Sequence, residues 1–254
     1  AGALLKELRT ALPQAEALVR WVGGLTVPED EQAFTCVALR HPEEYAITAG
    51  RIVSSEGLDI AVEAYEAHFQ ESHVPHSTAL YSHLDGKPYL VGPLARLNLN
   101  RDRLPAPVLQ NLARTGVSFP SRNMFHSALA RAVEIHYAVL EAIRLLEAYT
   151  LPEAPRVEVS ARAGEGAGCT EAPRGILWHR YALDERGDVL HAKIVPPTSQ
   201  NQARIEEDLH RSLEALGLDS DEEALRLRGE TVIRNYDPCI SCATHFLRLR
   251  VERE

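Results

Sequence analysis

Apolar residues recur every three to four positions in several long stretches of this chain, which is the spacing of one face of an α-helix. Charged residues occupy the positions between them, so each stretch would bury one side and expose the other. Glycine pairs or prolines follow some of these stretches, as expected where a helix ends. The pattern predicts amphipathic helices over residues 3–22, 59–69, 123–149, 202–216 and 220–233.

Shorter runs of β-prone residues predict strands. Residues 175–183 and 189–195 flank a turn cluster at 184–188 and predict two paired strands. Asp85-Gly86 between β-prone runs predicts a hairpin that joins 79–81 to 89–91.

Other segments carry weaker signals. Residues 34–39 fit a strand or a buried loop equally well, and residues 47–53 and 157–159 are further strand candidates. Residues 98–105 read as a polar loop, and residues 163–168 as a flexible glycine loop. Because a strand and not a helix follows that loop, its glycines do not form a dinucleotide-binding turn.

These elements predict an α+β fold that is mainly helical, a long helix bundle with small antiparallel hairpins. We expect residues 1–254 to form a single domain, since neither an internal repeat nor a low-complexity linker divides them. His136 lies on the apolar side of the longest helical stretch, where we expect a core residue and not a ligand.

Composition narrows the classes of function. The chain is 45% hydrophobic and 25% charged, with a net charge of −9, which argues against nucleic acid as a partner. No run approaches the roughly 18 apolar residues of a membrane span. These features predict a cytoplasmic protein without a membrane partner.

The densest chemistry lies near the end of the chain, in Asp237-Pro238-Cys239, Cys242 and His245. Two thiols three residues apart can share a metal or form a disulfide. A C-x-x-C pair by itself fits half a zinc site, a redox dithiol or part of a cluster site. The flanking Asp-Pro and the histidine make the pattern more specific.

This stretch resembles the D-P-C-x-x-C-x-x-H motif of the large subunit of nickel–iron hydrogenases. The resemblance extends upstream: Glu171-Ala172-Pro173-Arg174-Gly175 is similar to that family's E-A-P-R-G segment, and Val195-Pro196-Pro197-Thr198-Ser199-Gln200-Asn201 to its V-P-x-T-x-x-N loop. His76-Ser77-Thr78 and the segment from Leu90 to Asn98 resemble the cytoplasmic branch that serves nicotinamide nucleotides or cofactor F420.

The resemblance implies a metal centre. Cys239 would be a terminal nickel ligand and Cys242 a thiolate that bridges nickel to an iron carrying cyanide and carbon monoxide, a Ni-Fe(CN)2(CO) centre. His245, with the backbone carbonyl of Ile194, would bind a magnesium ion nearby.

The resemblance also assigns roles around the centre. Arg174, paired with Asp237, would lie over the open face of the metal centre and assist the heterolytic splitting of H2. Pro173 would shape the protein wall over the same face. Arg174 and Thr198, with the backbone near Pro197, would donate hydrogen bonds to the cyanides.

The resemblance also implies partners: an iron–sulfur small subunit and, beyond it, NAD(P)-reducing diaphorase subunits that take electrons from H2.

The family's large subunits are longer and carry a second C-x-x-C near the N-terminus, which this sequence lacks. We therefore expect residues 1–254 to be the C-terminal part of such a subunit and to be inactive in isolation. The alternative is a non-catalytic relative of hydrogenases and complex I with a structural or interaction role. Cys36 and Cys169 are predicted to be structural.

Overall fold

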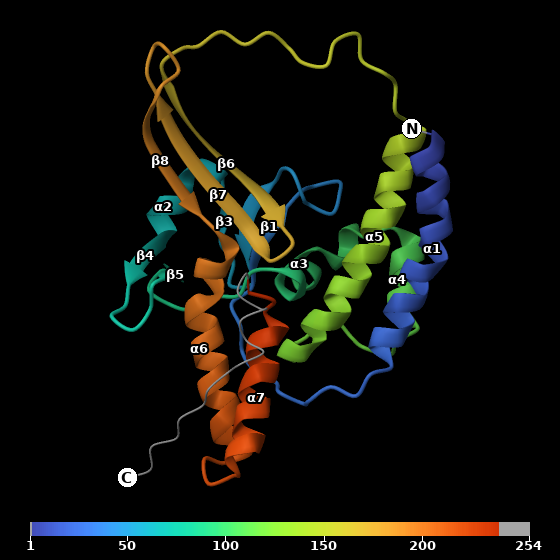
Figure 1. Cartoon of the computed structure of the whole chain (residues 1–254), viewed down its shortest axis with the longest axis vertical. Coiled ribbons are helices and arrows are strands. Elements are labelled where there is room, and N and C mark those ends of the chain that lie inside the picture. Colours follow the sequence, from blue (N-terminus) through green and yellow to red (C-terminus); the bar gives the residue numbers. More distant parts are fainter. Residues whose placement is uncertain (1, 239–254) are drawn as a thin grey trace.

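The computed structural model describes residues 2–238 and separates into a helical part and a β-rich part (Figure 1). The helices are α1 (Gly2–Gly23), α2 (Tyr65–His68), α3 (Pro93–Asn100), α4 (Ala106–Ala113), α5 (Ser127–Glu147), α6 (Pro197–Leu216) and α7 (Glu222–Asn235). Short 3₁₀ helices are η1 (Val62–Ala64), η2 (Arg101–Arg103) and η3 (Met124–His126).

The strands form small antiparallel sheets. They are β1 (Val37–Arg40), β2 (Arg51–Ser54), β3 (Asp59–Ile60), β4 (Phe69–His73), β5 (Leu80–Leu84), β6 (Gly164–Ala172), β7 (Gly175–Leu183) and β8 (Val189–Val195). Within the described residues the sheet orders are β1-β2-β3, β4-β5 and β6-β7-β8, with neighbouring strands consecutive in the chain. Such hairpin connections need only short turns.

The helical part is held together by apolar faces. α1 lies side by side with α5, α4 contacts both of these helices, and α3 packs against α5 (Figure 1). The buried residues of α5 include Leu129 and Val133, at the four-residue spacing that the sequence pattern predicts. α6 and α7 form an antiparallel pair that joins the same core through Ile205 and Val232.

The β-rich part has a second core built from aromatic rings. Trp178 on β7 stacks on Tyr65 at 4.8 Å between ring centroids, and Tyr65 stacks on Phe69 at 4.3 Å. The indole Nε1 donates to the carbonyl oxygen of Val62 at 2.8 Å, so the buried ring keeps its hydrogen bond. This core fixes β7, and with β7 the turn that precedes it.

The structure confirms the α+β class and the predicted helices over 3–22, 123–149, 202–216 and 220–233. The strands at 175–183 and 189–195 are confirmed residue for residue. Within residues 2–238 no helix has the length and apolar character needed to cross a membrane.

The predicted hairpin between 79–81 and 89–91 is wrong in its pairing. The turn at Asp85-Gly86 is present, with φ of 46° and 79°, but β5 pairs with β4 instead. Leu90 leaves this hairpin to exchange backbone hydrogen bonds with the chain at Thr35 and Val37, 2.9 and 2.8 Å long. Pro88 has no N–H to extend the ladder, which helps the chain to leave.

Other local predictions are also corrected. Residues 164–168 of the predicted glycine loop at 163–168 belong to β6, because pairing along the whole of β7 outweighs the low strand preference of glycine. Residues 157–159 are exposed and irregular, and the helix expected over 59–69 is reduced to η1 and α2 between strands. Residues 98–105 continue α3 into η2 and are not a loop throughout.

Candidate functional site

Arg174 lies on a two-residue turn between β6 and β7. Ala172 and Gly175 form the last pair of the ladder, so Pro173 and Arg174 occupy the tip of the hairpin. The turn is at the end of the sheet that faces α3 and α7, while the other end of the same hairpin points away (Figure 1). The arginine is therefore carried by a paired, twisted ribbon and not by a long loop.

Two glycines allow this turn to approach another backbone segment. Gly175 has φ of +135°, and a Cβ there would lie 2.3 Å from Cγ2 of Val91. Gly92 has φ of +108°, and its Cβ would lie 2.8 Å from the carbonyl oxygen of Arg174. Both conformations are unfavourable for residues with a side chain. The two glycines thus press the turn against residues 91–92.

The start of α6 locks the same junction. Asn201 accepts from the N–H of Val91 at 2.9 Å and donates to its carbonyl at 3.1 Å. Gln200 donates to the carbonyls of Ile176 at 2.7 Å and Val195 at 3.2 Å. Both amide side chains are buried. They tie α6, β7, β8 and the segment before α3 into one rigid frame around the turn.

A buried arginine holds the turn from its other side. Arg96 on α3 donates to both carboxylate oxygens of Glu134, at 2.6 and 2.7 Å, and to Glu171 at 2.9 Å. It also donates to the carbonyls of Ala172 at 2.7 Å and Pro173 at 3.1 Å. Burial disfavours the charge of Arg96, but the carboxylates of Glu134 and Glu171 raise its pKa well above the ordinary value. Burial raises the pKa of Glu171.

Arg174 pairs with Asp237 at the C-terminal end of α7. Nη2 of Arg174 lies 3.2 Å from Oδ2 of Asp237, and its Nε donates to the backbone carbonyl of the same residue. Asp237 has φ of 47°, a left-handed conformation that commonly ends helices. This conformation turns the chain out of α7, so that the arginine contacts the residue just before Pro238.

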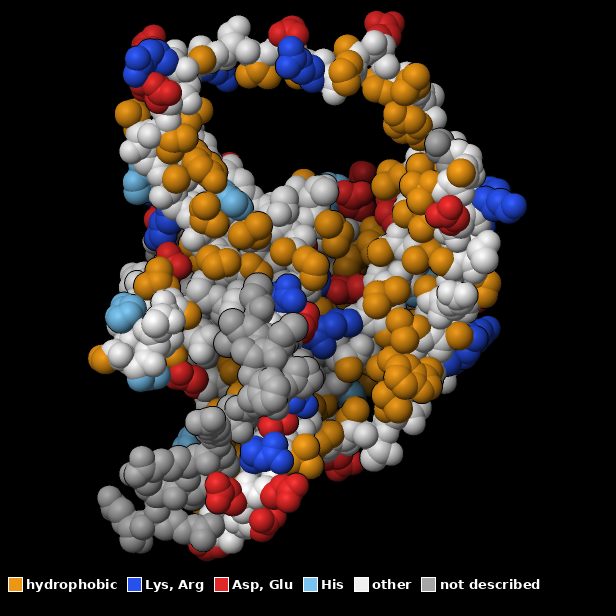
Figure 2. Space-filling model, viewed as in Figure 1, with side chains coloured by type: hydrophobic (Ala, Val, Ile, Leu, Met, Phe, Trp, Pro, Cys, Tyr) orange, Lys and Arg blue, Asp and Glu red, His pale blue; other side chains and the backbone are white. Residues whose placement is uncertain are grey.

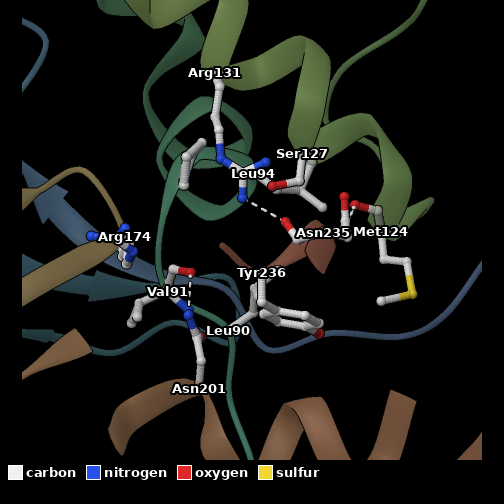
Figure 3. Close-up of a pocket in the computed structure, with 11 residues that line it drawn as sticks. Leu90, Val91, Leu94, Met124, Ser127, Arg131, Arg174, Asn201, Asn235 and Tyr236 are labelled. Carbon is white, nitrogen blue, oxygen red and sulfur yellow. Dashed lines mark hydrogen bonds between the residues drawn. The ribbon is translucent and has the colours of Figure 1, made fainter. Parts of the chain in front are cut away.

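Arg131 brings a second guanidinium to this place. Its Nη2 donates to the carbonyl of Asn235 at 2.5 Å, which satisfies one of the free carbonyls at the end of α7. In Figure 3 Arg131 descends from α5 toward Asn235, and Arg174 enters from the β6–β7 side. Burial lowers the pKa of Arg131 while Asp237 opposes that effect. Both arginines line a void of about 10 Å³, close to the space for one water.

A larger cavity of about 730 Å³ opens on the far side of Arg131. Its walls are α5, the segment 44–48, Pro173 and Asp237. Ile135 and Leu145, 47% and 54% exposed, line it from α5. Figure 2 shows hydrophobic side chains along this face of the helical part. The predicted site residues Pro173 and Asp237 therefore lie at the border of an open, partly apolar hollow.

The remaining predicted site residues are placed as follows. Pro197 and Thr198 are the first two residues of α6, with Pro197 buried and Thr198 partly exposed. Ile194 lies on β8 opposite His179 and is 49% exposed. The predicted metal ligands Cys239, Cys242 and His245 lie outside the described residues.

The described part of the chain, residues 2–238, has no group of three or more His, Cys, Asp or Glu that could hold a metal ion. The predicted thiols begin one residue after Pro238. Thiolates are the ligands that nickel and iron accept in such sites. The thiols of the sequence and the arginine held beside Asp237 are the groups that the resemblance implies for a nickel–iron centre.

Comparison with known proteins finds a family whose members match the part of the chain that contains these residues. The sequence profile of the family described as nickel-dependent hydrogenase matches residues 65–245. The chain belongs to the nickel-dependent hydrogenase family. The match includes the Arg174 turn, the start of α6 and the C-x-x-C stretch, three of the places where the sequence resembles nickel–iron hydrogenases.

Relatives within the family are subunits of larger size. Sulfhydrogenase 1 subunit alpha of Pyrococcus furiosus is 38% identical over 248 residues, which cover 96% of this chain and 57% of that protein. The NAD-reducing hydrogenase HoxS subunit beta of Cupriavidus necator is 37% identical over 62% of this chain and 34% of its own length. The chain thus spans about half the length of its relatives, or less.

Solved structures support the fold. The structure of an NAD+-reducing [NiFe]-hydrogenase in the H2-reduced state matches 96% of this chain and 59% of its own chain, with a TM-score of 0.75 and 24% identity. A [NiFeSe] hydrogenase variant from Desulfovibrio vulgaris Hildenborough matches with a TM-score of 0.65 and 21% identity, over 96% of this chain and 60% of its own. The chain has the fold of part of a hydrogenase large subunit.

Sequence reasoning missed the groups that hold Arg174 in place. Arg96 and Glu171 lie within segments that carry the resemblance, yet the sequence predicts no role for either. Glu134 and Arg131 are charged residues between the apolar positions of 123–149, a pattern that predicts only the polar side of an amphipathic helix. One signal was available for Arg96, a charged residue inside the apolar run from Leu94 to Leu97. A buried charge needs a partner, and the partners are distant in sequence.

Proposed function

We propose that this chain is the C-terminal part of the catalytic subunit of a nickel–iron hydrogenase that oxidises H2 reversibly. The observation that carries the proposal is the pairing of Arg174 with Asp237. A rigid turn holds a guanidinium against the residue that leads through Pro238 into Cys239 and Cys242.

The proposal assigns the metal ligands that the resemblance implies. Cys239 and Cys242 would hold the nickel–iron centre, whose iron would carry cyanide and carbon monoxide. When bound, this centre supplies the heterolytic cleavage of H2. His245 and the carbonyl of Ile194 would hold a magnesium ion.

The chain's own residues orient and stabilise charge around the centre. A guanidinium stays protonated at neutral pH and offers N–H donors in a fixed plane, so Arg174 acts as a donor and as a positive charge. Asp237 holds the plane of Arg174 through its carboxylate and its carbonyl. Thr198 and the backbone near Pro197 would supply further hydrogen-bond donors to the cyanides. Pro173 would shape the protein wall over the open face of the centre.

Electrons from H2 need a route out of the subunit. We propose an iron–sulfur small subunit that docks near the centre and diaphorase subunits that reduce NAD(P). The NAD-reducing relative from Cupriavidus necator supports this acceptor. A nicotinamide nucleotide acceptor places the enzyme in the cytoplasm.

The test uses the complete subunit assembled with its partners. We expect stoichiometric nickel and exchange of H2 with D2O, and loss of both in Cys239→Ser and Cys242→Ser variants. Retained nickel in both cysteine variants would overturn the assignment of the ligands. Assembly without nickel and without exchange would favour the non-catalytic, structural role instead.

A further inference from the structure

Arg96 is one of the most fully bonded side chains in the described part of the chain. It is 2% exposed, and each of its five N–H groups has an acceptor within 3.1 Å. Three of these bonds go to the carboxylates of Glu134 and Glu171, and two go to the backbone carbonyls of Ala172 and Pro173.

We propose that Arg96 is a positioning residue for Arg174: its guanidinium clamps the two carbonyls that precede Arg174 and so fixes where that side chain meets Asp237. The inference rests on the proposed hydrogenase function for its catalytic consequence. The structural part of the inference, that Arg96 holds the turn in place, does not depend on that function.

The two carbonyl bonds separate a clamp from an ordinary buried ion pair. Charge neutralisation of Arg96 needs only the carboxylates of Glu134 and Glu171. The remaining N–H groups point at the tip of the β6–β7 hairpin, where they bond the carbonyl of Ala172, in the last pair of the ladder, and the carbonyl of Pro173, in the turn. The guanidinium plane thereby joins α3 and α5 to the residues immediately before Arg174.

The carboxylates are themselves held, so the clamp has a rigid base. Glu171 accepts from the backbone N–H of Leu39 at 2.8 Å. Glu134 accepts from the hydroxyl of Tyr45 at 2.7 Å. With β1, α5 and the segment around Tyr45 all bonded to the pair, Arg96 has little freedom to move away from the turn.

Lysine cannot replace this arrangement. An ammonium group carries three donors at a single point, whereas the guanidinium reaches five acceptors spread around its plane. Arg96→Lys keeps a buried positive charge for Glu134 and Glu171 while it releases the turn. This variant therefore separates the charge of Arg96 from its bonds to Ala172 and Pro173.

The experiment compares the assembled parent enzyme with Arg96→Lys, Arg174→Lys and the double variant. Two quantities are measured: the rate of H2 exchange with D2O, and amide hydrogen exchange of the peptide that covers residues 171–177. We expect Arg96→Lys to keep its nickel, to lower the H2 exchange rate on the order of a hundredfold, and to speed amide exchange in the turn. In the Arg174→Lys background, Arg96→Lys should lower the rate by less than about threefold, because the two changes act on the same step.

Arg40→Lys is the matched control. Arg40 bonds both oxygens of the Asp102 carboxylate, at 3.1 and 2.7 Å, and the carbonyl of Leu99, but makes none of the contacts with the β6–β7 turn. It should leave both measurements within about twofold of the parent, since its bonds lie away from the turn.

The outcomes are separable. If Arg96→Lys leaves amide exchange of residues 171–177 unchanged, or if its effect multiplies fully with that of Arg174→Lys, the clamp is wrong. If the parent enzyme shows no H2 exchange but Arg96→Lys still loosens the turn, the proposed function fails and the clamp stands. Should Arg96→Lys not assemble, the charge-balanced double variant Arg96→Gln with Glu134→Gln takes its place with the same expected results.

Discussion

Arg174 and Asp237 are 63 residues apart in the chain, yet the Nη2 of one lies 3.2 Å from the Oδ2 of the other. The hairpin turn of β6–β7 supplies the arginine, and the left-handed end of α7 supplies the aspartate. Each partner is held in place by its own element. The pair therefore joins the sheet to the start of the C-x-x-C stretch.

Replacing Arg174 by lysine should lower H2 exchange with D2O in the assembled enzyme by about a hundredfold or more, the usual effect of losing one aligned electrostatic donor. Arg174 and Asp237 are 32% and 41% exposed, so their pairing contributes little to folding. The melting temperature should therefore change little. Full activity in the lysine variant would show that charge alone is sufficient and that the planar donor is not needed.

Replacing Gly175 by alanine should disturb the turn. The added Cβ would lie 2.3 Å from Val91 and would require a φ of +135°. We expect a loss of about 1–3 kcal/mol in the free energy of unfolding, measured by denaturant titration, and reduced activity. Gly168→Ala, on the neighbouring strand β6, is the control: its Cβ would meet nothing within 4 Å, and its effect should stay within about 1 kcal/mol. Equal losses in both variants would contradict the close-approach argument.

Some of the fold follows from local pattern. β7, β8 and the long helix α5 have strong periodicity and clear turn residues at their ends, and each was predicted. β6 was not, because its glycine-rich sequence has little strand preference, and only the paired neighbour β7 makes it a strand. The hairpin at Asp85 was predicted with the wrong partner for a similar reason, since pairing depends on segments distant in sequence.

Part of the candidate site can likewise be predicted from the sequence, and part of it cannot. Arg174 and Asp237 lie in short motifs that can be read directly from the sequence. Arg96 meets Glu134, 38 residues away, and Glu171, 75 residues away, so no local spacing could reveal the cluster. Burial is the property that gives Arg96 its role, and burial is decided by how α3 packs against α5.

Asn201 offers a test of the frame that surrounds the turn. Asn201→Asp keeps an acceptor for the N–H of Val91 but cannot donate to the Val91 carbonyl, 3.1 Å away. A buried unpaired acceptor costs about 1–3 kcal/mol, more beside a charge, so a drop in melting temperature of several degrees is expected. Gln110→Ala, a change to an exposed amide on α4, serves as the control and should leave the melting temperature unchanged. An unaltered melting temperature for Asn201→Asp would remove Asn201 from the frame.

Cys36 and Cys169 should resist alkylation in the folded protein. Both are buried, and burial raises the pKa of the Cys36 thiol to about 11 and that of Cys169 still further. Because the thiolate is the reactive form, iodoacetamide near neutral pH should label both sites only after unfolding. Mass spectrometry of the peptides gives the sites of labelling. Alanine at either position should leave the nickel content of the assembled enzyme unchanged, and rapid labelling of native protein would contradict a structural role.

His136 should make the fold sensitive to acid. Burial lowers its pKa below the ordinary value of 6.5, and the side chain, which extends from α5, is fully buried against Asn111. The unfolded chain takes up a proton on this ring at a higher pH than the folded chain does. The stability associated with His136 is therefore present above pH 6.5 and is lost as the pH falls through that value and through the lower folded value.

The measurement is the melting temperature between about pH 8 and about pH 5. His136→Gln removes the titrating ring, so its melting temperature, although lower at neutral pH because of the altered packing, should fall less steeply with acid than that of the parent. His126, whose pKa is also lowered by burial, remains in both proteins and contributes equally to the two curves. His210→Gln, at a histidine whose side chain is 71% exposed, is the control and should follow the parent curve. If His136→Gln were to fall as steeply as the parent, the acid sensitivity would arise from other groups.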